Sequence, residues 1–261
     1  MDARGYGSIF VSHGSPMLAV EAGPARDFLI RLGQELPKPR AVIVASPHWQ
    51  ARGFAVKQAE RFRAWHDFYG FPSELYRLSY APPGEPQLAA QIEQHLRAQG
   101  LPTHGVSGDP RIDHGVWIPL MLMYPQADVP VVQVAISGDG PDAHLKLGRA
   151  LGAMRLDGVL VLGSGGATHN LGELGHGGAP AQWSARFDDW LAQRLADGDW
   201  DALTAYREQA PDAARAHPTE EHLMPLFVAG GAGGRAVELH RSFSYGTLSM
   251  AAYGFEAATV Q

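Results

Sequence analysis

The sequence predicts an α/β protein with one domain, in which a central, largely parallel or mixed β-sheet is flanked by helices. Short apolar runs rich in valine and isoleucine alternate along the chain with longer segments of helical period. This alternation is typical of a sheet whose strands are connected by covering helices. No internal repeat and no linker divides the 261 residues, so we expect residues 1–261 to form one domain.

Each expected strand is an apolar run bounded by glycine, proline or serine, as buried strands are. The four clearest runs cover 8–12, 41–46, 129–137 and 158–164. The expected helices place apolar residues three and four positions apart, and several begin at proline, which suits the first helical turn. They cover 24–36, 86–100, 141–154 and 183–198. The segment 235–256 is expected to form terminal antiparallel strands.

The composition excludes several kinds of site. The formal net charge of −6 offers no basic surface for nucleic acid or an anionic membrane. There is no cysteine, which excludes disulfides, thiolate metal sites and a cysteine nucleophile, and leaves imidazole and carboxylate as metal ligands. No long apolar segment and no leader-like start is present, so we expect a cytoplasmic protein.

Histidines follow three of the expected strands. His13 comes directly after the first strand, His48 follows the second across a Ser-Pro pair, and His169 follows the fourth through a glycine turn. Because the carboxyl ends of parallel strands meet at one edge of a sheet, these side chains are expected to converge. His114 begins an apolar helical stretch, and His222 is expected in the first turn of a helix that starts near Pro218.

Other motifs are weaker. A nucleophile elbow, G-x-S-x-G, fails around Ser164 because Leu162 replaces its first glycine. A dinucleotide fingerprint from Gly163 fails because Thr168 replaces its last glycine. The segment "WHDFYGFP" (65–72) is either a hydrophobic plug over the core or a lid over a flat aromatic ligand. In the lid interpretation it covers the site and His66 is not a metal ligand.

Six ordered motifs resemble one family: "SHGSPML", "SPHW", "WHDFYGFP", "DHGVWIPL", "GSGGATHNL" and "HPTEEHLMPLF". The chain is similar to the DODA-type extradiol aromatic ring-opening dioxygenases, the class III group related to the catalytic subunit of protocatechuate 4,5-dioxygenase. The resemblance implies an extradiol dioxygenase-like catalytic domain over 1–261. Its implied metal ligands are His13, His48 and His222, with His169 as the acid–base residue and His114 contacting the substrate.

The resemblance also implies the reaction. We expect a non-haem enzyme, working with Fe(II), that inserts O2 into a DOPA-like or other 1,2-dihydroxybenzene and opens the ring beside the diol to a muconic semialdehyde. The protocatechuate branch has a glutamate where this chain has His222, and three imidazoles also suit Zn(II).

Two alternatives therefore remain, a zinc hydrolase using the same ligands and a binding protein without chemistry. Arg63, Arg77 and Arg111 are candidates for a substrate carboxylate. The oligomeric state, monomer or homo-oligomer, is left open.

Overall fold

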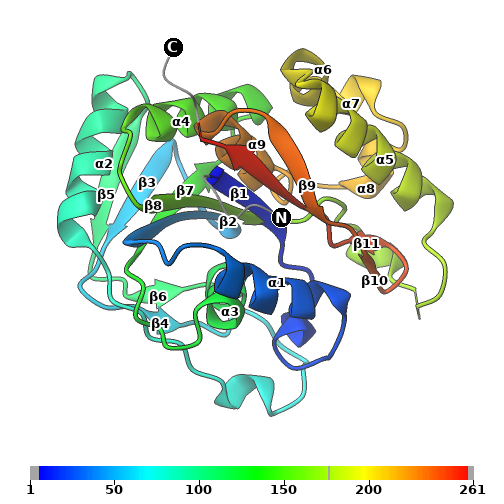
Figure 1. Cartoon of the computed structure of the whole chain (residues 1–261), viewed down its shortest axis with the longest axis horizontal. Coiled ribbons are helices and arrows are strands. Elements are labelled where there is room, and N and C mark those ends of the chain that lie inside the picture. Colours follow the sequence, from blue (N-terminus) through cyan, green and yellow to red (C-terminus); the bar gives the residue numbers. More distant parts are fainter. Residues whose placement is uncertain (1–5, 176, 258–261) are drawn as a thin grey trace.

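Eight strands form the central sheet of the computed structural model, which describes residues 6–175 and 177–257. They are β1 (Tyr6–Ser12), β2 (Ala41–Ala51), β3 (Phe54–Gln58), β5 (Thr103–Ser107), β7 (Val131–Ser137), β8 (Val159–Gly165), β9 (Ala236–His240) and β12 (Ala252–Glu256). Their order across the sheet is β5-β3-β7-β2-β8-β1-β12-β9 (Figure 1). The pairs β7-β2, β2-β8, β8-β1 and β3-β5 are parallel, whereas β3-β7, β1-β12 and β12-β9 are antiparallel. The predicted α/β class with a mixed sheet is confirmed, as are the antiparallel strands at the C-terminal end.

Helices cover both faces of this sheet. They are α1 (Pro24–Glu35), α2 (Pro86–Ala98), α3 (His114–Met123), α4 (Pro141–Ala153), α5 (Gln182–Asp197) and α9 (Met224–Ala232). Figure 1 shows α1 and α3 on one side and α4, α5 and α9 on the other. Side chains alternate along each strand, so Ile9 and Val11 pack with α1 and α3 while Phe10 faces the opposite core. The two faces therefore carry two separate hydrophobic cores.

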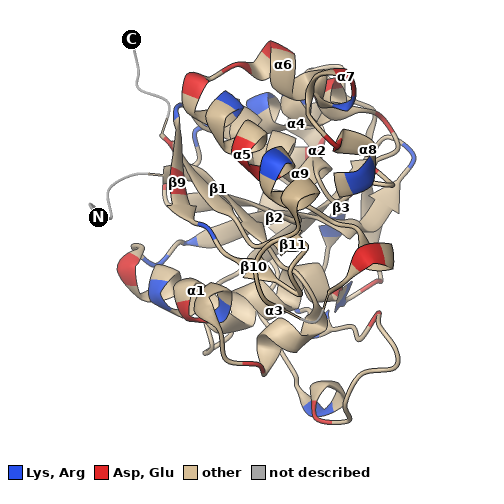
Figure 2. Cartoon of the chain, turned by 90° about the vertical axis from the view of Figure 1, so that its right-hand side faces the viewer, with Lys and Arg blue, Asp and Glu red and all other residues tan. Residues whose placement is uncertain are grey.

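Smaller elements complete the chain. They are β4 (Arg63–Ala64), β6 (Arg111–Ile112), β10 (Phe243–Ser244), β11 (Leu248–Ser249), the short 3₁₀ helices η1 (Pro16–Ala19), η2 (Leu75–Arg77) and η3 (Leu171–Glu173), and α6 (Trp200–Thr204), α7 (Tyr206–Gln209) and α8 (Ala213–Ala216). Charged side chains lie on the outer helices and loops with both signs interspersed, while the central strands carry few (Figure 2). No helix among the described residues is both long and apolar enough to span a lipid bilayer.

Two element boundaries near the histidines differ from the expected ones. The strand expected over 41–46 continues to Ala51, and its register against β7 shifts between Ser46 and Gln50. His48 lies within this bulge, an irregularity that re-aims side chains in many active sites. The helix expected from Pro218 begins at Met224 instead. Pro225 explains this, because a proline is tolerated in the first helical turn but not farther inside a helix.

Candidate metal centre

Three neighbouring parallel strands bring the strand-end histidines together. In the sheet, β8 lies between β2 and β1. His13 directly follows β1, His48 occupies the bulge of β2, and β8 leads through two glycines to His169. The predicted convergence at one edge of the sheet therefore has its origin in the strand order.

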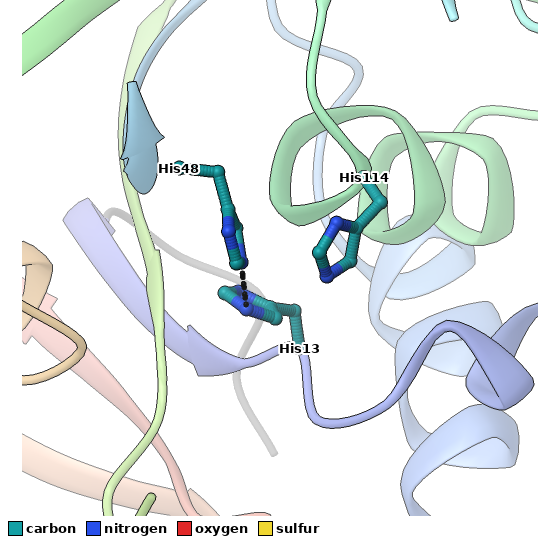
Figure 3. Close-up of side chains that lie close together, drawn as sticks. All are labelled: His13, His48 and His114. Atoms are coloured by element: carbon teal, nitrogen blue, oxygen red, sulfur yellow. Dashed lines mark hydrogen bonds between the residues drawn. The ribbon is translucent and has the colours of Figure 1, made fainter. Parts of the chain in front are cut away.

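Two imidazole nitrogens face each other at the middle of this group. The Nε2 atoms of His13 and His48 are 3.2 Å apart. The ring of His114, at the start of α3, lies 4.1 Å from that of His48 and 5.5 Å from that of His13, measured between centroids. Figure 3 shows the three rings directed toward a common point. One potential ligand nitrogen from each lies within 4.8 Å of the others, a spacing that suits one metal ion.

His169 and His222 form the adjoining wall. Their rings are stacked, with centroids 3.3 Å apart and planes inclined by 6°. The His222 ring lies 5.0 Å from that of His48 and 5.7 Å from that of His13. Its Nε2 atom is buried and has no hydrogen-bond partner among the described residues. All five histidines singled out from the sequence thus belong to one cluster, although the ligand set His13, His48 and His222 stays a prediction.

In three of these rings, Nδ1 lies within hydrogen-bond distance of an oxygen atom. Nδ1 of His13 lies 3.0 Å from Ser164 Oγ, Nδ1 of His114 lies 3.0 Å from Asp67 Oδ1, and Nδ1 of His222 lies 3.0 Å from Glu221 Oε1. Ionised carboxylates only accept hydrogen bonds, and Ser164 already donates its hydroxyl proton to the Gly115 carbonyl. The network therefore assigns the proton to Nδ1 in each ring and leaves Nε2 with a free lone pair, as metal ligation requires.

Burial disfavours protonation of four of these histidines. Burial, reinforced by the neighbouring histidines, holds the pKa values of His13 and His222 well below the usual range. Burial and the proximity of His114 lower the pKa of His48 to about 3, although Asp67 opposes this. Burial lowers the pKa of His169 to about 4 against the opposing effect of Glu221. Neutral imidazoles at pH 7 are ready to bind a metal or accept a proton.

The model of the family "Catalytic LigB subunit of aromatic ring-opening dioxygenase" matches residues 7–256, nearly the whole chain. The chain belongs to this family. The identification drawn from the six motifs is confirmed, and the chain is an extradiol ring-cleaving dioxygenase of the LigB family, whose members are metal-dependent.

Several relatives of the LigB-family chain carry the same description. A 4,5-DOPA dioxygenase extradiol of Beta vulgaris is 38% identical over 257 residues, which is 95% of this chain and 96% of the relative. A protein of the same description from Escherichia coli K12 is 35% identical over 86% of this chain and 84% of its own. The crystal structure of an uncharacterised Escherichia coli K12 protein superposes with a TM-score of 0.80 at 29% identity, covering 97% of this chain and all of that one.

A buried carboxylate joins the metal-facing elements of the LigB-family chain. Asp113 is the capping residue of α3, but its side chain makes no hydrogen bond to that helix. It accepts hydrogen bonds from Ser46 Oγ on β2 and from Gln133 Nε2 on β7, both at 2.6 Å. Burial raises the pKa of Asp113, and these two donors oppose the rise. The carboxylate therefore fixes the start of α3 against the strand that carries His48.

Glycines let the backbone segments around the histidine cluster approach one another closely. A Cβ atom on Gly115 would lie 2.5 Å from Ser46 Oγ and 3.0 Å from His13 Cε1, both too close for ordinary contact. Gly165 leaves room for the carbonyl of His222, which accepts a hydrogen bond of 2.9 Å from the amide of Gly166. The expected glycine turn after β8 therefore also positions the turn that carries His222.

The aromatic segment 65–72 lies against the histidines. Asp67 binds His114, and the Phe68 ring lies 5.6 Å from the His114 ring. Nε2 of His66 instead lies 3.1 Å from the Leu78 carbonyl, so this histidine stabilises the loop between the two residues. Tyr69 is 92% exposed. The segment thus lies at the site, as the lid interpretation expects, and its Phe68 and Phe71 also pack against the core beside α3, as the plug interpretation expects.

The roles of three supporting residues were not predicted from the sequence. Ser164 was tested only as a nucleophile, and Asp67 and Glu221 appeared only as members of the motifs that contain them. Each binds a histidine through a contact that depends on the fold. The sequence signal for such a residue is an acidic or hydroxyl side chain in the same motif as the histidine that it binds. Only Glu221 gave that signal.

Proposed function

We propose that the chain opens the ring of a catechol beside its two hydroxyl groups, with Fe(II) as the working metal, to give a muconic semialdehyde. The observation that carries the proposal is the set of inward nitrogens. His13 and His48 present Nε2 atoms 3.2 Å apart, and Nε2 of His222 is buried without a partner. Ligand nitrogens about 2.1 Å from a tetrahedral ion lie roughly 3.4 Å from one another. The 3.2 Å between the nitrogens of His13 and His48 fits two ligands of such an ion.

His13, His48 and His222 would hold the metal, with His114 and His169 beside it. Ferrous iron, when bound, supplies the redox-active centre that allows triplet O2 to react with a closed-shell catechol. The buried Nε2 of His222 has no partner among the described residues, which is costly unless something binds it. Burial lowers the pKa of His222, so protonation does not supply that partner. The residues therefore suit a divalent cation.

His169 is proposed as the residue that takes a phenolic proton when the catechol binds and returns it later. Burial keeps its imidazole neutral near pH 7, which is the state that accepts a proton. Its ring is fixed by stacking on His222, and its amide donates to the Ala216 carbonyl at 2.8 Å. His169 is thereby held beside His222 and is not itself a proposed metal ligand.

A DOPA-like catechol is the proposed substrate, since the relatives from plants and from Escherichia coli are described as 4,5-DOPA dioxygenases. The aromatic segment 65–72 offers Phe68 as an apolar surface beside His114. Arg111 lies next to this segment, with its guanidinium 4.9 Å from the Trp65 ring, and remains a candidate for a substrate carboxylate together with Arg63 and Arg77. Cytoplasmic location and the oligomeric state stay predictions.

A zinc hydrolase is the second candidate, because three imidazoles form a donor set that zinc also takes. The deciding experiment loads metal-free protein anaerobically with Fe(II) or, in a matched sample, with Zn(II). Both are then given oxygen and a panel of substituted catechols, and oxygen uptake is recorded. Uptake with iron and none with zinc supports the dioxygenase. Absence of uptake by the iron-loaded protein with every catechol would refute it.

A further inference from the structure

Asp67 makes two hydrogen bonds to a single residue of the centre. Its Oδ1 atom accepts from the amide nitrogen of His114 at 2.9 Å and contacts the ring Nδ1 of the same residue at 3.0 Å. The two residues are 47 positions apart in the chain. The other oxygen, Oδ2, lies 3.8 Å from Nδ1 of His48. The side chain of Asp67 is only 7% exposed, so water competes little for these contacts.

This arrangement fixes the ring of His114. An oxygen that binds both the amide and the Nδ1 of one residue closes a small ring of contacts, which selects one side-chain rotamer. Because a carboxylate is only an acceptor, Nδ1 carries the proton and Nε2 presents its lone pair. In Figure 3 the His114 ring is directed toward His13 and His48.

Asp67 also replaces a missing helix cap. The first amides of a helix lack partners within the helix and are usually satisfied by the side chain of the capping residue. In α3 that residue is Asp113, whose carboxylate is engaged by Ser46 and Gln133. Asp67 therefore satisfies the first amide of α3 from another part of the chain.

The chain just before Asp67 is anchored to its neighbours by hydrogen bonds. The Trp65 carbonyl accepts from Trp117 Nε1 at 3.0 Å, and the Trp65 amide donates to the Ile112 carbonyl at 2.8 Å. His66 is bound to Leu78 across the loop. Two residues beyond Asp67, Tyr69 is almost fully exposed. Asp67 thus lies at the fixed base of the aromatic segment, where that segment meets the centre.

From these contacts we propose that Asp67 is a positioning residue for His114. It holds the Nδ1-protonated tautomer and aims the unprotonated Nε2 at the centre, where that nitrogen accepts a hydrogen bond from a substrate hydroxyl. The substrate part of the inference rests on the proposed function. The tautomer and orientation do not, since they follow from the contacts of Asp67 alone.

The test compares Asp67→Ala and Asp67→Asn with the parent protein. Asp128→Asn is the matched control, because Asp128 pairs with Lys38 on the surface and contacts none of the five histidines in the described part of the chain. The first readout is the ¹⁵N chemical shifts of labelled histidine rings in the metal-free proteins, with the His114 signals identified by their loss in His114→Gln. We expect the parent and the control to show the Nδ1–H tautomer at His114, and Asp67→Ala to show a mixture. An unchanged tautomer in Asp67→Ala would overturn the proposal.

The second readout separates positioning from folding. Iron content and thermal midpoint are measured for each variant, followed by kcat and KM for catechol cleavage. We expect kcat of Asp67→Ala to fall about 10–100-fold with iron content preserved, and Asp67→Asn to lie between it and the parent. A lower thermal midpoint with unchanged kcat would mean that Asp67 only caps α3. Loss of iron would mean that Asp67 acts on His48, a proposed metal ligand, and not on His114. Either result overturns the proposal.

If the parent itself cleaves no catechol, the proposed function fails, while the tautomer comparison still decides the role of Asp67. Should Asp67→Ala fail to fold, Asp67→Asn gives the same comparison, because its amide retains one acceptor oxygen but lacks the charge. A His114 tautomer and a kcat that both match those of the parent in Asp67→Asn would then refute the inference.

Discussion

Replacing Gly115 by alanine tests how tightly the centre is packed. Gly115 lies in the first turn of α3, where alanine is ordinarily the better residue by about 1 kcal/mol. Helix propensity alone therefore predicts a more stable protein. The structure predicts the opposite, because the added Cβ would lie 2.5 Å from Ser46 Oγ and 3.0 Å from His13 Cε1.

The size of the effect follows from what surrounds the new methyl group. Ordinary contact begins near 3.4 Å, so Ser46 must move by about 0.9 Å or α3 must shift. Ser46 is fully buried and donates to Asp113 at 2.6 Å. Overpacking costs about 1–3 kcal/mol, and weakening a bond to a buried carboxylate adds about 1–3 kcal/mol. After subtracting the helix gain of about 1 kcal/mol, we expect a net loss of about 1–5 kcal/mol, or roughly 2–20 °C in thermal midpoint.

The assay is thermal unfolding of the metal-free protein, followed by titration of the metal against a chelator. We expect Gly115→Ala to bind metal more weakly, because the displaced atoms belong to His13 and to the strand of His48. Gly138→Ala is the matched control, since a Cβ there meets nothing within 4 Å. A variant at Gly115 that is as stable as the control, or more stable, with parent-like metal affinity would refute the packing argument.

Three further predictions concern named side chains. His169→Gln should keep its metal and slow turnover by about 10²–10⁴-fold, the usual contribution of a positioned acid–base group. His13→Ala should lose metal and activity together. Equal metal loss in the two variants would contradict these roles. Burial lowers the pKa of His217 to about 4, so between pH 6.5 and 4 the unfolded chain binds a proton that the folded chain does not. Stability of the metal-free protein should therefore fall with decreasing pH, by about 1.4 kcal/mol per pH unit from this residue, and denaturant titrations of His217→Gln should show a shallower slope; an unchanged slope would speak against it. Glu221→Gln should weaken metal binding by about 10–100-fold, because the carboxylate orients His222; a chelator titration that matches the parent would exclude this role.

The histidines were predictable from the sequence because their positions depend on local patterns. An apolar run followed by a turn marks the end of a strand, and parallel neighbours then bring His13, His48 and His169 to one edge. The strand β3 and its partner β5 were not predicted, since their short runs contain a lysine, a glutamine and a histidine that break the apolar signal. Local propensity was also a poor guide at Pro218, because a second proline, Pro225, decides where the helix can begin.

The residues that orient the histidines could not be predicted in the same way. Ser164 and His13 are 151 positions apart, and Asp67 and His114 are 47 apart. Such pairs depend on the strand order and on the path of a loop, neither of which has a signal in a single sequence. Asp113 is the instructive case, because its place before a helix correctly marks a capping position while its carboxylate serves the sheet instead.

In the proposed function, five histidines at one edge of the sheet support cleavage of a catechol ring by O2. The most direct test gives iron-loaded protein a 4-substituted catechol in oxygenated buffer and determines the mass of the product together with the oxygen consumed. We expect one O2 taken up for each catechol lost, and a ring-opened product heavier than the catechol by both oxygen atoms. Catechol recovered intact without oxygen uptake, while the iron is demonstrably bound by the histidines, would contradict the account.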